Sequence, residues 1–204
     1  MNMQVPVNGL VLAGGKSVRM GRDKSAIPWH GKEQQYYVAD LLQAFCQDVF
    51  ISRREWQPEI APGYQVLLDS YTGIGPYGAI LSAFAAVPER AWLVVACALP
   101  LIDKATLSFL FANRDPGKMA TTFQSPHDGL PEPLITIWEP SSQAVLLEYL
   151  SGGYTCPRKV LIRAGNALIL QPPEADSLLN VNTPEDLARA EQLILIKKEL
   201  YGAG

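Results

Sequence analysis

The sequence predicts an α/β fold built around a mainly parallel sheet, and three observations support this. Apolar runs of strand length alternate along the chain with segments in which apolar residues recur at helical spacing. The run at residues 92–99 (WLVVACAL) is continuously apolar, which is typical of a central strand buried on both faces. The 204 residues are 48% hydrophobic, enough for one sizeable core, and no repeat or linker divides them. We therefore expect a single domain over residues 1–204.

The first half of the chain alternates regularly between strands and helices. Residues 9–13 are the first expected strand, a helix follows at 37–46, and residues 49–52 complete a βαβ unit. The elements expected after this unit are a short strand at 66–69, a helix at 79–87, the central strand at 92–99 and a helix at 105–113.

The second half alternates less regularly. Its expected elements are β-rich runs at 119–124 and 133–138 joined by a loop at 125–132, and helices at 143–150 and 160–163. Near the end of the chain, Thr183 can cap a helix, Pro184 suits the first helical position, and Asp186 can complete a capping box. We expect a helix from there to about residue 200.

Composition argues against several classes of protein. A formal charge of −3 does not fit a protein that neutralises nucleic-acid phosphates, because that task needs a basic face. No apolar run reaches the roughly 20 residues of a membrane span, and residues 1–9 lack a targeting signal, so we expect a cytoplasmic protein. Cys46, Cys97 and Cys156 are odd in number and widely spaced, which favours reduced thiols over disulfides or a zinc site.

The loop after the first strand, residues 12–24, has the composition of an anion site. It carries four basic residues within nine positions and one acid, although the chain as a whole is acidic. The paired glycines Gly14 and Gly15 let a phosphate approach backbone amides closely, while Arg19 and Lys24 can contact phosphate oxygens. At the carboxyl edge of a parallel sheet, a ligand crevice is expected.

Two common phosphate loops do not fit this stretch. A P-loop would need a glycine five residues before Gly15, where Leu10 stands. Gly14, Gly15 and Gly21 also lack the G-x-G-x-x-G spacing of dinucleotide-binding proteins. The sequence therefore argues against a P-loop NTPase and against a dinucleotide dehydrogenase.

The string LAGGKSVRMGRDK resembles the pattern L-A-G-G-x-S-x-R-M-G-x-D-K of the molybdenum cofactor guanylyltransferase family. This resemblance implies a three-layer αβα, Rossmann-like nucleotidyltransferase fold. It extends over residues 8–190, where further matching segments occur in the expected order: Asp69 before GIGP at 73–76, VVACALP at 94–100, LPEPL at 130–134 and NVNTPEDL at 180–187.

The resemblance implies transfer of GMP from GTP to the phosphate of molybdopterin, with release of pyrophosphate. It places nucleotide binding in the N-terminal half and acceptor binding in the C-terminal half. Arg19 and Lys24 match charge-stabilising, catalytic positions, and Asn180 and Asn182 match polar groups toward the pterin acceptor. The implied partners are GTP, molybdopterin and molybdoenzyme or cofactor-chaperone proteins. The implied nucleotide-binding residues are Leu12, Ala13, Gly14, Gly15, Lys24, Ser52 and Asp69.

Ala98 departs from the family pattern, which has V-A-C-D-L-P where this chain has VACALP. The family's aspartate holds Mg²⁺, and a methyl group offers no oxygen ligand. Three interpretations stay open. The chain binds nucleotide but catalyses poorly, or phosphates, water and another acid such as Asp69 hold the metal, or the alignment is shifted and Asp103 supplies the carboxylate.

Other polar residues are weaker candidates. His30 and His127 are the only histidines and do not predict a histidine-based acid, base or metal site. Glu132, between two prolines, belongs to an acceptor pocket or to a surface turn. Arg158 and Lys159 open a short helix and are candidates to meet an anionic acceptor.

Two alternatives to guanylyl transfer remain at this stage. Cytidylyl transfer, or transfer to another phosphorylated acceptor, uses the same chemistry, because base choice depends on contacts that motifs do not reveal. A non-catalytic module that holds nucleotide or cofactor for a molybdoenzyme is the alternative from a different class, and Ala98 motivates it.

Overall fold

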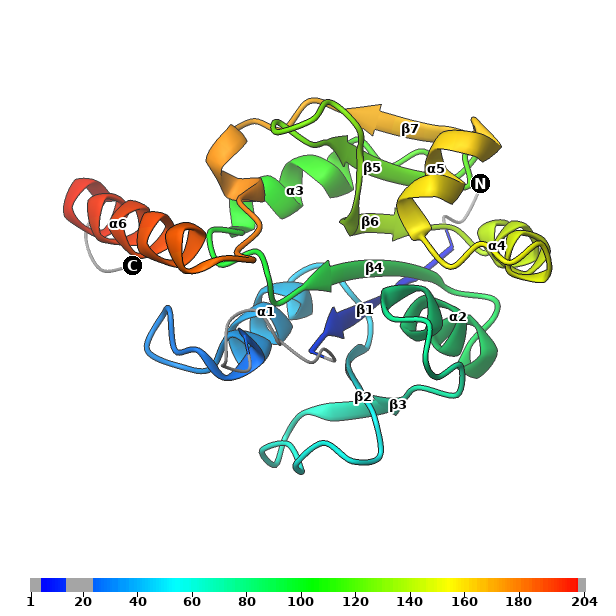
Figure 1. Cartoon of the computed structure of the whole chain (residues 1–204), viewed down its shortest axis with the longest axis horizontal. Coiled ribbons are helices and arrows are strands. Elements are labelled where there is room, and N and C mark those ends of the chain that lie inside the picture. The colour runs from blue at the N-terminus through cyan, green and yellow to red at the C-terminus, as the bar shows by residue number, and fades with distance from the viewer. Residues whose placement is uncertain (1–4, 14–23, 202–204) are drawn as a thin grey trace.

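A computed structural model describes residues 5–13 and 24–201 of the chain and shows seven strands in one sheet (Figure 1). The strands are β1 (Val7–Leu12), β2 (Val49–Arg53), β3 (Gln65–Leu68), β4 (Ala91–Ala96), β5 (Ala120–Gln124), β6 (Pro131–Trp138) and β7 (Ala167–Leu170). The helices are α1 (Gln34–Gln43), α2 (Pro76–Ala86), α3 (Lys104–Ala112), α4 (Ser142–Ser151), α5 (Pro157–Ala164) and α6 (Pro184–Tyr201), with 3-10 turns η1 (Lys24–Ala26) and η2 (Ala175–Leu178).

The sheet is mostly parallel, as predicted, and its strand order is β3-β2-β1-β4-β6-β5-β7. All neighbouring strands run parallel except at β6, which is antiparallel to both β4 and β5. The continuously apolar strand β4 lies in the middle of this order, which confirms its predicted central position. Because β6 runs backwards, its first residues lie at the sheet edge where β4 ends.

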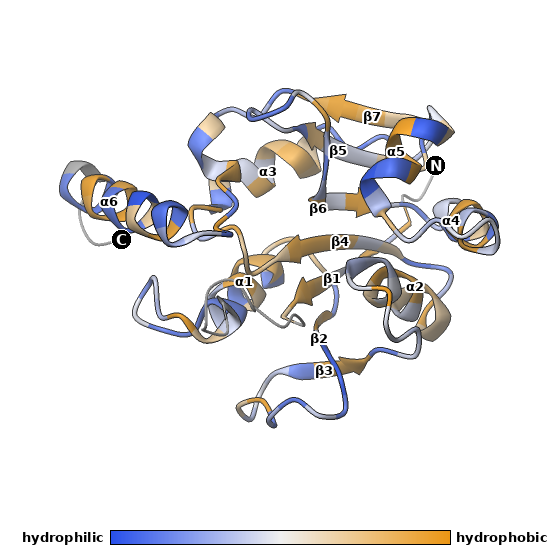
Figure 2. Cartoon of the chain, viewed as in Figure 1, coloured by the Kyte–Doolittle hydropathy of each residue, from blue (hydrophilic) through white to orange (hydrophobic). Residues whose placement is uncertain are grey.

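Helices cover both faces of the sheet, so the molecule has three layers. On one face, Val11, Leu93 and Val95 pack with residues of α1 and α3. On the other face, Leu10 and Trp92 pack with residues of α2, α4 and α5. Alternate residues of one strand thus enter opposite cores, and β1 and β4 are mostly orange in Figure 2.

Most predicted elements occur within a few residues of their expected bounds, with two exceptions. The strand β7 was not predicted, because it lies at the edge of the sheet and none of its four residues is fully buried. Glu132, expected in a loop, belongs to β6 and is only 4% exposed. The prolines on either side of it lack an N–H, and the hydroxyls of Thr122 and Thr136 donate to the Glu132 carbonyl at 2.7 and 2.8 Å.

The predicted start of α6 is confirmed in detail. The Thr183 hydroxyl accepts from the Asp186 amide at 3.1 Å, and the Asp186 carboxylate accepts from the Thr183 amide at 2.9 Å. Buried Ala190 and Ile194 of this helix pack with Trp29. Among the helices of the described part of the chain, none has the length and apolar character that crossing a bilayer requires.

Cys46, Cys97 and Cys156 form no disulfide with one another. Cys97 is buried at the end of β4, and Cys46 and Cys156 are half-buried. Burial raises the pKa of Cys46 to about 12, so its thiol stays protonated and is a poor nucleophile at neutral pH.

Gly78 in α2 is expected to tolerate no side chain. A Cβ atom built there would lie 2.0 Å from the Tyr71 carbonyl oxygen, which belongs to the backbone of the turn before α2. Ser82 holds the same turn by accepting from the Ser70 and Tyr71 amides at 2.9 and 3.1 Å. Gly78→Ala should lower the free energy of unfolding by about 2–3 kcal/mol, measured by urea denaturation.

Gly152→Ala is the control for this prediction. A Cβ atom at Gly152 would meet its nearest neighbour at 3.4 Å, which is ordinary van der Waals contact. We expect a change within about 0.5 kcal/mol there. Equal effects at the two glycines would contradict the predicted clash.

Candidate functional site

Three of the predicted nucleotide-binding residues, Leu12, Ser52 and Asp69, lie at the carboxyl edge of the sheet. Leu12 pairs with Ser52 of β2 on one side and with Ala96 of β4 on the other. Asp69 follows the last residue of β3, and its amide donates to the Arg53 carbonyl at 2.9 Å. This is the edge at which parallel α/β sheets bind ligands.

Ser52 and Asp69 form a direct polar contact at this edge. The Ser52 hydroxyl, which is buried, donates to Asp69 Oδ1 at 2.7 Å. Burial raises the pKa of the Asp69 carboxyl, while the hydrogen bond from Ser52 and the charge of Arg54 act in the opposite direction. The pair therefore presents a fixed acceptor group beside the start of the loop at residues 12–24, called here the glycine-rich loop.

The raised pKa of Asp69 should make the stability of the fold depend on pH. Between the ordinary pKa of 3.8 and the raised value, the folded state binds more protons than the unfolded chain, so the free energy of unfolding falls as pH rises. Asp69→Asn should remove this part of the fall in the free energy of unfolding, which urea denaturation measures between about pH 4 and about pH 7. Ser52→Ala, which removes a hydrogen bond that lowers this pKa, should extend the decline to higher pH. An unchanged pH profile in Asp69→Asn would contradict the argument.

The glycine-rich loop is anchored where it leaves β1. The side-chain amide of Gln57 donates to the Ala13 carbonyl at 3.3 Å and accepts from the Arg54 amide at 2.8 Å. Gly14, Gly15 and Arg19, which sequence analysis assigned to the phosphate site, lie outside the described residues, and the described chain resumes at Lys24 with η1.

The chain that follows the loop is tied to the segment after β4. His30 Nε2 lies 2.8 Å from the Pro100 carbonyl oxygen, and the Gln34 side chain donates to the Leu99 carbonyl at 3.2 Å. The His30 ring stacks on Tyr37, with 3.8 Å between ring centroids, and burial lowers its pKa. His30 therefore packs on Tyr37 and joins the segment after η1 to the segment after β4.

Ala98 lies just beyond the end of β4, next to the segment that contains the predicted acceptor residues. Its carbonyl accepts a hydrogen bond from the Val181 amide at 2.9 Å. Asn180 and Asn182 are the chain neighbours of Val181, so this hydrogen bond brings both close to Ala98. Two segments some eighty residues apart in sequence thus meet at the end of the central strand.

The described residues at this edge do not form a complete metal site by themselves. The Ala98 side chain is a methyl group, and no group of three or more His, Cys, Asp or Glu side chains among residues 5–13 and 24–201 could hold a metal ion. Asp103, the alternative carboxylate, caps α3: its Oδ1 accepts from the Thr106 amide and hydroxyl, both at 2.8 Å. Its other oxygen lies 3.5 Å from Lys197 Nζ.

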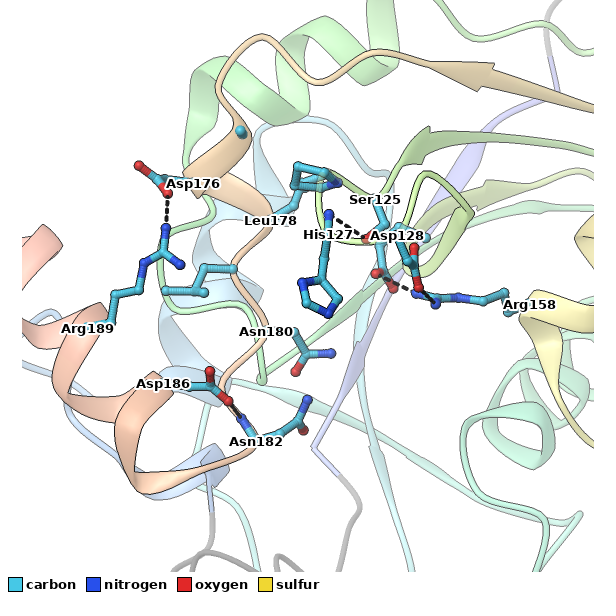
Figure 3. A pocket seen from close by; sticks show the side chains of 14 residues that line it. Ser125, His127, Asp128, Arg158, Asp176, Leu178, Asn180, Asn182, Asp186 and Arg189 are labelled. Carbon is cyan, nitrogen blue, oxygen red and sulfur yellow. Dashed lines mark hydrogen bonds and ion pairs between the residues drawn. The ribbon is translucent and has the colours of Figure 1, made fainter.

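A cavity of ≈ 670 Å³ opens beside Asn180 (Figure 3). Arg158 of α5 forms one end, where it contacts Asp128 at 2.6 Å and Glu132 at 3.0 Å. The pair Asp176–Arg189, 3.0 Å apart, forms the other end. The lining residues are Ser125, Pro126, His127, Asp128, Glu132, Arg158, Ala175, Asp176, Leu178, Leu179, Asn180, Asn182, Asp186 and Arg189. A cavity of this size can hold a small heterocyclic ligand.

The family model for the MobA-like NTP transferase domain matches residues 9–167, which include the glycine-rich loop and strands β2 to β6. The chain belongs to the MobA-like NTP transferase family. Its relatives include a molybdenum cofactor biosynthesis bifunctional protein of Synechocystis sp., 35% identical over 90% of this chain and 53% of that protein. This chain thus spans about half the length of that relative.

Other relatives match the MobA-like transferase chain along nearly their whole length. A molybdenum cofactor guanylyltransferase of Pseudomonas paraeruginosa is 32% identical over 92% of this chain and 96% of its own. A solved structure, molybdopterin-guanine dinucleotide biosynthesis protein A from Archaeoglobus fulgidus, has a TM-score of 0.72 at 23% identity and covers 93% of this chain. These matches confirm the Rossmann-like nucleotidyltransferase fold.

Sequence analysis missed part of what lines the site of this MobA-like transferase. Asp128 was not singled out, and Gln57 has no motif around it, because a side chain bonded to a distant carbonyl leaves no local pattern. The prolines around Glu132 suggest a loop, and the sequence is compatible with either an acceptor pocket or a surface turn there. The structure resolves this: Glu132 is buried and lines the cavity.

Proposed function

We propose that this chain transfers a guanylyl group from GTP to the phosphate of molybdopterin. An oxygen of the acceptor phosphate attacks the α-phosphorus and forms a new P–O bond, while the bond from that phosphorus to the bridging oxygen breaks and pyrophosphate leaves. The acceptor is already an anion, so the reaction needs charge neutralisation and in-line alignment more than a base.

The observation that carries this proposal is membership of the MobA-like transferase family together with the meeting of three segments at one sheet edge. The end of β1 enters the glycine-rich loop there, Ser52 and Asp69 lie beside it, and the segment containing Asn180 and Asn182 bonds to Ala98. The relatives named guanylyltransferase support the same reaction.

The proposed roles follow the two halves of the chain, which we treat as one domain. Leu12, Ala13, Gly14 and Gly15 supply the backbone that contacts the triphosphate, and Ser52 and Asp69 lie toward the base and ribose. Arg19 and Lys24 neutralise charge on the reacting phosphorus and on the leaving pyrophosphate. Asn180 and Asn182 bind the acceptor. Because the described residues offer no cluster of three or more metal ligands, the proposed steps use only the side chains and backbone groups named above.

Pyrophosphate release tests the proposal. The chain is incubated with GTP and molybdopterin, with CTP in a parallel reaction, and we expect release with GTP. Ala98→Asp should raise the rate about tenfold or more in the presence of Mg²⁺, a change of about 1.4 kcal/mol in the barrier, if the missing carboxylate limits turnover. Absence of release from both the unaltered chain and Ala98→Asp would refute the proposal, and a preference for CTP would replace guanylyl by cytidylyl transfer.

A nucleotide-binding module without turnover is the second candidate, and Ala98 is the observation that favours it. It predicts GTP binding by the unaltered chain, measured by calorimetry, with no pyrophosphate release. Release from the unaltered chain at a rate typical of enzymes, about 1 per second or faster, would exclude this candidate.

A further inference from the structure

The cavity beside Asn180 is richer in hydrogen-bond acceptors than in available cations. Four of its lining residues are acids and two are arginines. Both arginines are already paired, Arg158 with Asp128 and Glu132, and Arg189 with Asp176. A phosphate entering here would meet a net negative lining, whereas an uncharged group with N–H donors would meet acceptors.

Glu132 is the most deeply buried of these acids. Its Oε1 accepts from the Leu134 amide at 3.2 Å and its Oε2 accepts from Arg158 at 3.0 Å. A carboxylate has about four acceptor positions, so two remain open after these contacts. Burial raises the pKa of Glu132, which indicates that the charge is incompletely compensated by its present partners.

Arg158 is better suited to hold these carboxylates than to bind a ligand anion. It is the second residue of α5, where a positive charge is unfavourable to the helix dipole. Its two terminal nitrogens reach Asp128 at 2.6 Å and Glu132 at 3.0 Å, so the guanidinium joins the loop before β6 to the strand itself. Figure 3 shows this group at one end of the cavity.

A second acceptor lies in the same cavity. Asn180 Oδ1 is buried and has no hydrogen-bond partner among residues 5–13 and 24–201. A buried acceptor without a partner costs about 1–3 kcal/mol, which a ligand N–H would recover. Figure 3 places Asn180 and the His127 ring between the Arg158 end and the Arg189 end.

Within the proposed acceptor, the pterin ring has the matching chemistry. Its 2-amino group and the adjacent ring N–H form a pair of neighbouring donors, which a carboxylate can bind with two oxygens. Guanine shares this donor edge, so the nucleotide base is the competing ligand that the experiment must distinguish from the pterin. The base belongs to the Ser52–Asp69 side in the proposed function, and β4 and β1 lie between that side and β6 in the sheet.

We propose that Glu132 and Asp128, held by Arg158, bind the 2-amino and ring N–H edge of the acceptor's pterin. The pterin head then occupies the cavity and its phosphate extends toward the glycine-rich loop. Glu132 is a specificity-determining residue and Arg158 a positioning residue. The assignment rests on the proposed function, because it takes the acceptor to be a pterin.

Binding of two simple heterocycles tests this without turnover. Pterin is compared with lumazine, in which a carbonyl replaces the 2-amino group, by fluorescence titration of the full chain. The unaltered chain should bind pterin about tenfold or more tightly than lumazine, because the lumazine carbonyl would face a carboxylate. Glu132→Gln, which can donate to that carbonyl, should reduce the preference to less than about threefold. Asp176→Asn at the far end of the same cavity is the matched control and should keep it.

Two further measurements test a second variant and distinguish the pterin from the nucleotide base as the ligand of the cavity. Asp128→Asn, in an exposed loop, provides a second variant and should weaken the preference partially. Saturating GTP should leave pterin affinity within about threefold, whereas competitive displacement would assign the cavity to the base. No pterin binding, equal binding of the two heterocycles, or an undiminished preference in Glu132→Gln would each overturn the inference. Pterin preference with no pyrophosphate release from either the unaltered chain or Ala98→Asp would refute only the proposed function, and release without preference would refute only this inference.

Discussion

Arg114→Ala is expected to lower the free energy of unfolding by about 3–5 kcal/mol, the largest effect on stability that we predict. Arg114 Nε and Nη2 lie 2.6 and 2.8 Å from the two carboxylate oxygens of Glu139, and both side chains are almost fully buried, at 3% and 2% exposure. Its third nitrogen donates to the Val5 carbonyl at 2.9 Å. Alanine would leave the Glu139 charge buried without a partner. Urea denaturation of the purified variant measures the change.

Arg189→Ala is the matched control for this prediction. Its partner Asp176 is also at hydrogen-bond distance, 3.0 Å, but the two side chains are 61% and 46% exposed. Water screens such a pair, so its loss should change stability by less than about 1 kcal/mol. Replacing both buried partners, as Arg114→Met with Glu139→Leu, should recover much of the loss, because no buried charge then remains. Similar losses in Arg114→Ala and Arg189→Ala would show that burial does not govern these pairs.

Lys24→Ala should lower kcat/KM for GTP about 10²–10³-fold, which is the usual effect of removing one group that stabilises developing charge. The argument comes from sequence: Lys24 ends the glycine-rich motif and supplies a compact cation for the leaving pyrophosphate. Initial rates of pyrophosphate release measure the effect, and Lys24→Arg should restore part of it by keeping the charge.

Lys32→Ala controls for a general loss of positive charge near the loop. The Lys32 ammonium pairs with Asp40 on the exposed surface of α1. Its removal should change kcat/KM by less than about threefold, because an exposed pair contributes little. If both lysine variants kept full activity, Lys24 would have no part in phosphate binding.

Where residues of the candidate site belong to one continuous segment, the sequence predicts them as a group. Gly14, Gly15, Arg19 and Lys24 stand within one motif, and this motif together with four further segments in the expected order indicated the family. The juxtaposition of Ser52 with Asp69 was not readable from spacing, because seventeen residues separate them and their contact depends on the parallel pairing of β2 with β3.

At Ala98, sequence and structure each revealed a different fact. Sequence comparison with the family pattern revealed that a carboxylate is missing, and the structure added that Asp103 caps α3 and that Ala98 bonds to Val181. Neither observation depends on the other. Together they place the departure from the pattern at the point where the proposed nucleotide and acceptor sides meet.

Local residue patterns predict the alternation of elements, the central place of β4 and the capping box of α6, because hydrophobic periodicity and helix capping act between residues close along the chain. Tertiary structure alone decided the reversed direction of β6, the burial of Glu132 and the pairing of Arg158 with Asp128. These features depend on which distant segments pack together, and the side-chain contacts that result have no counterpart in local residue patterns.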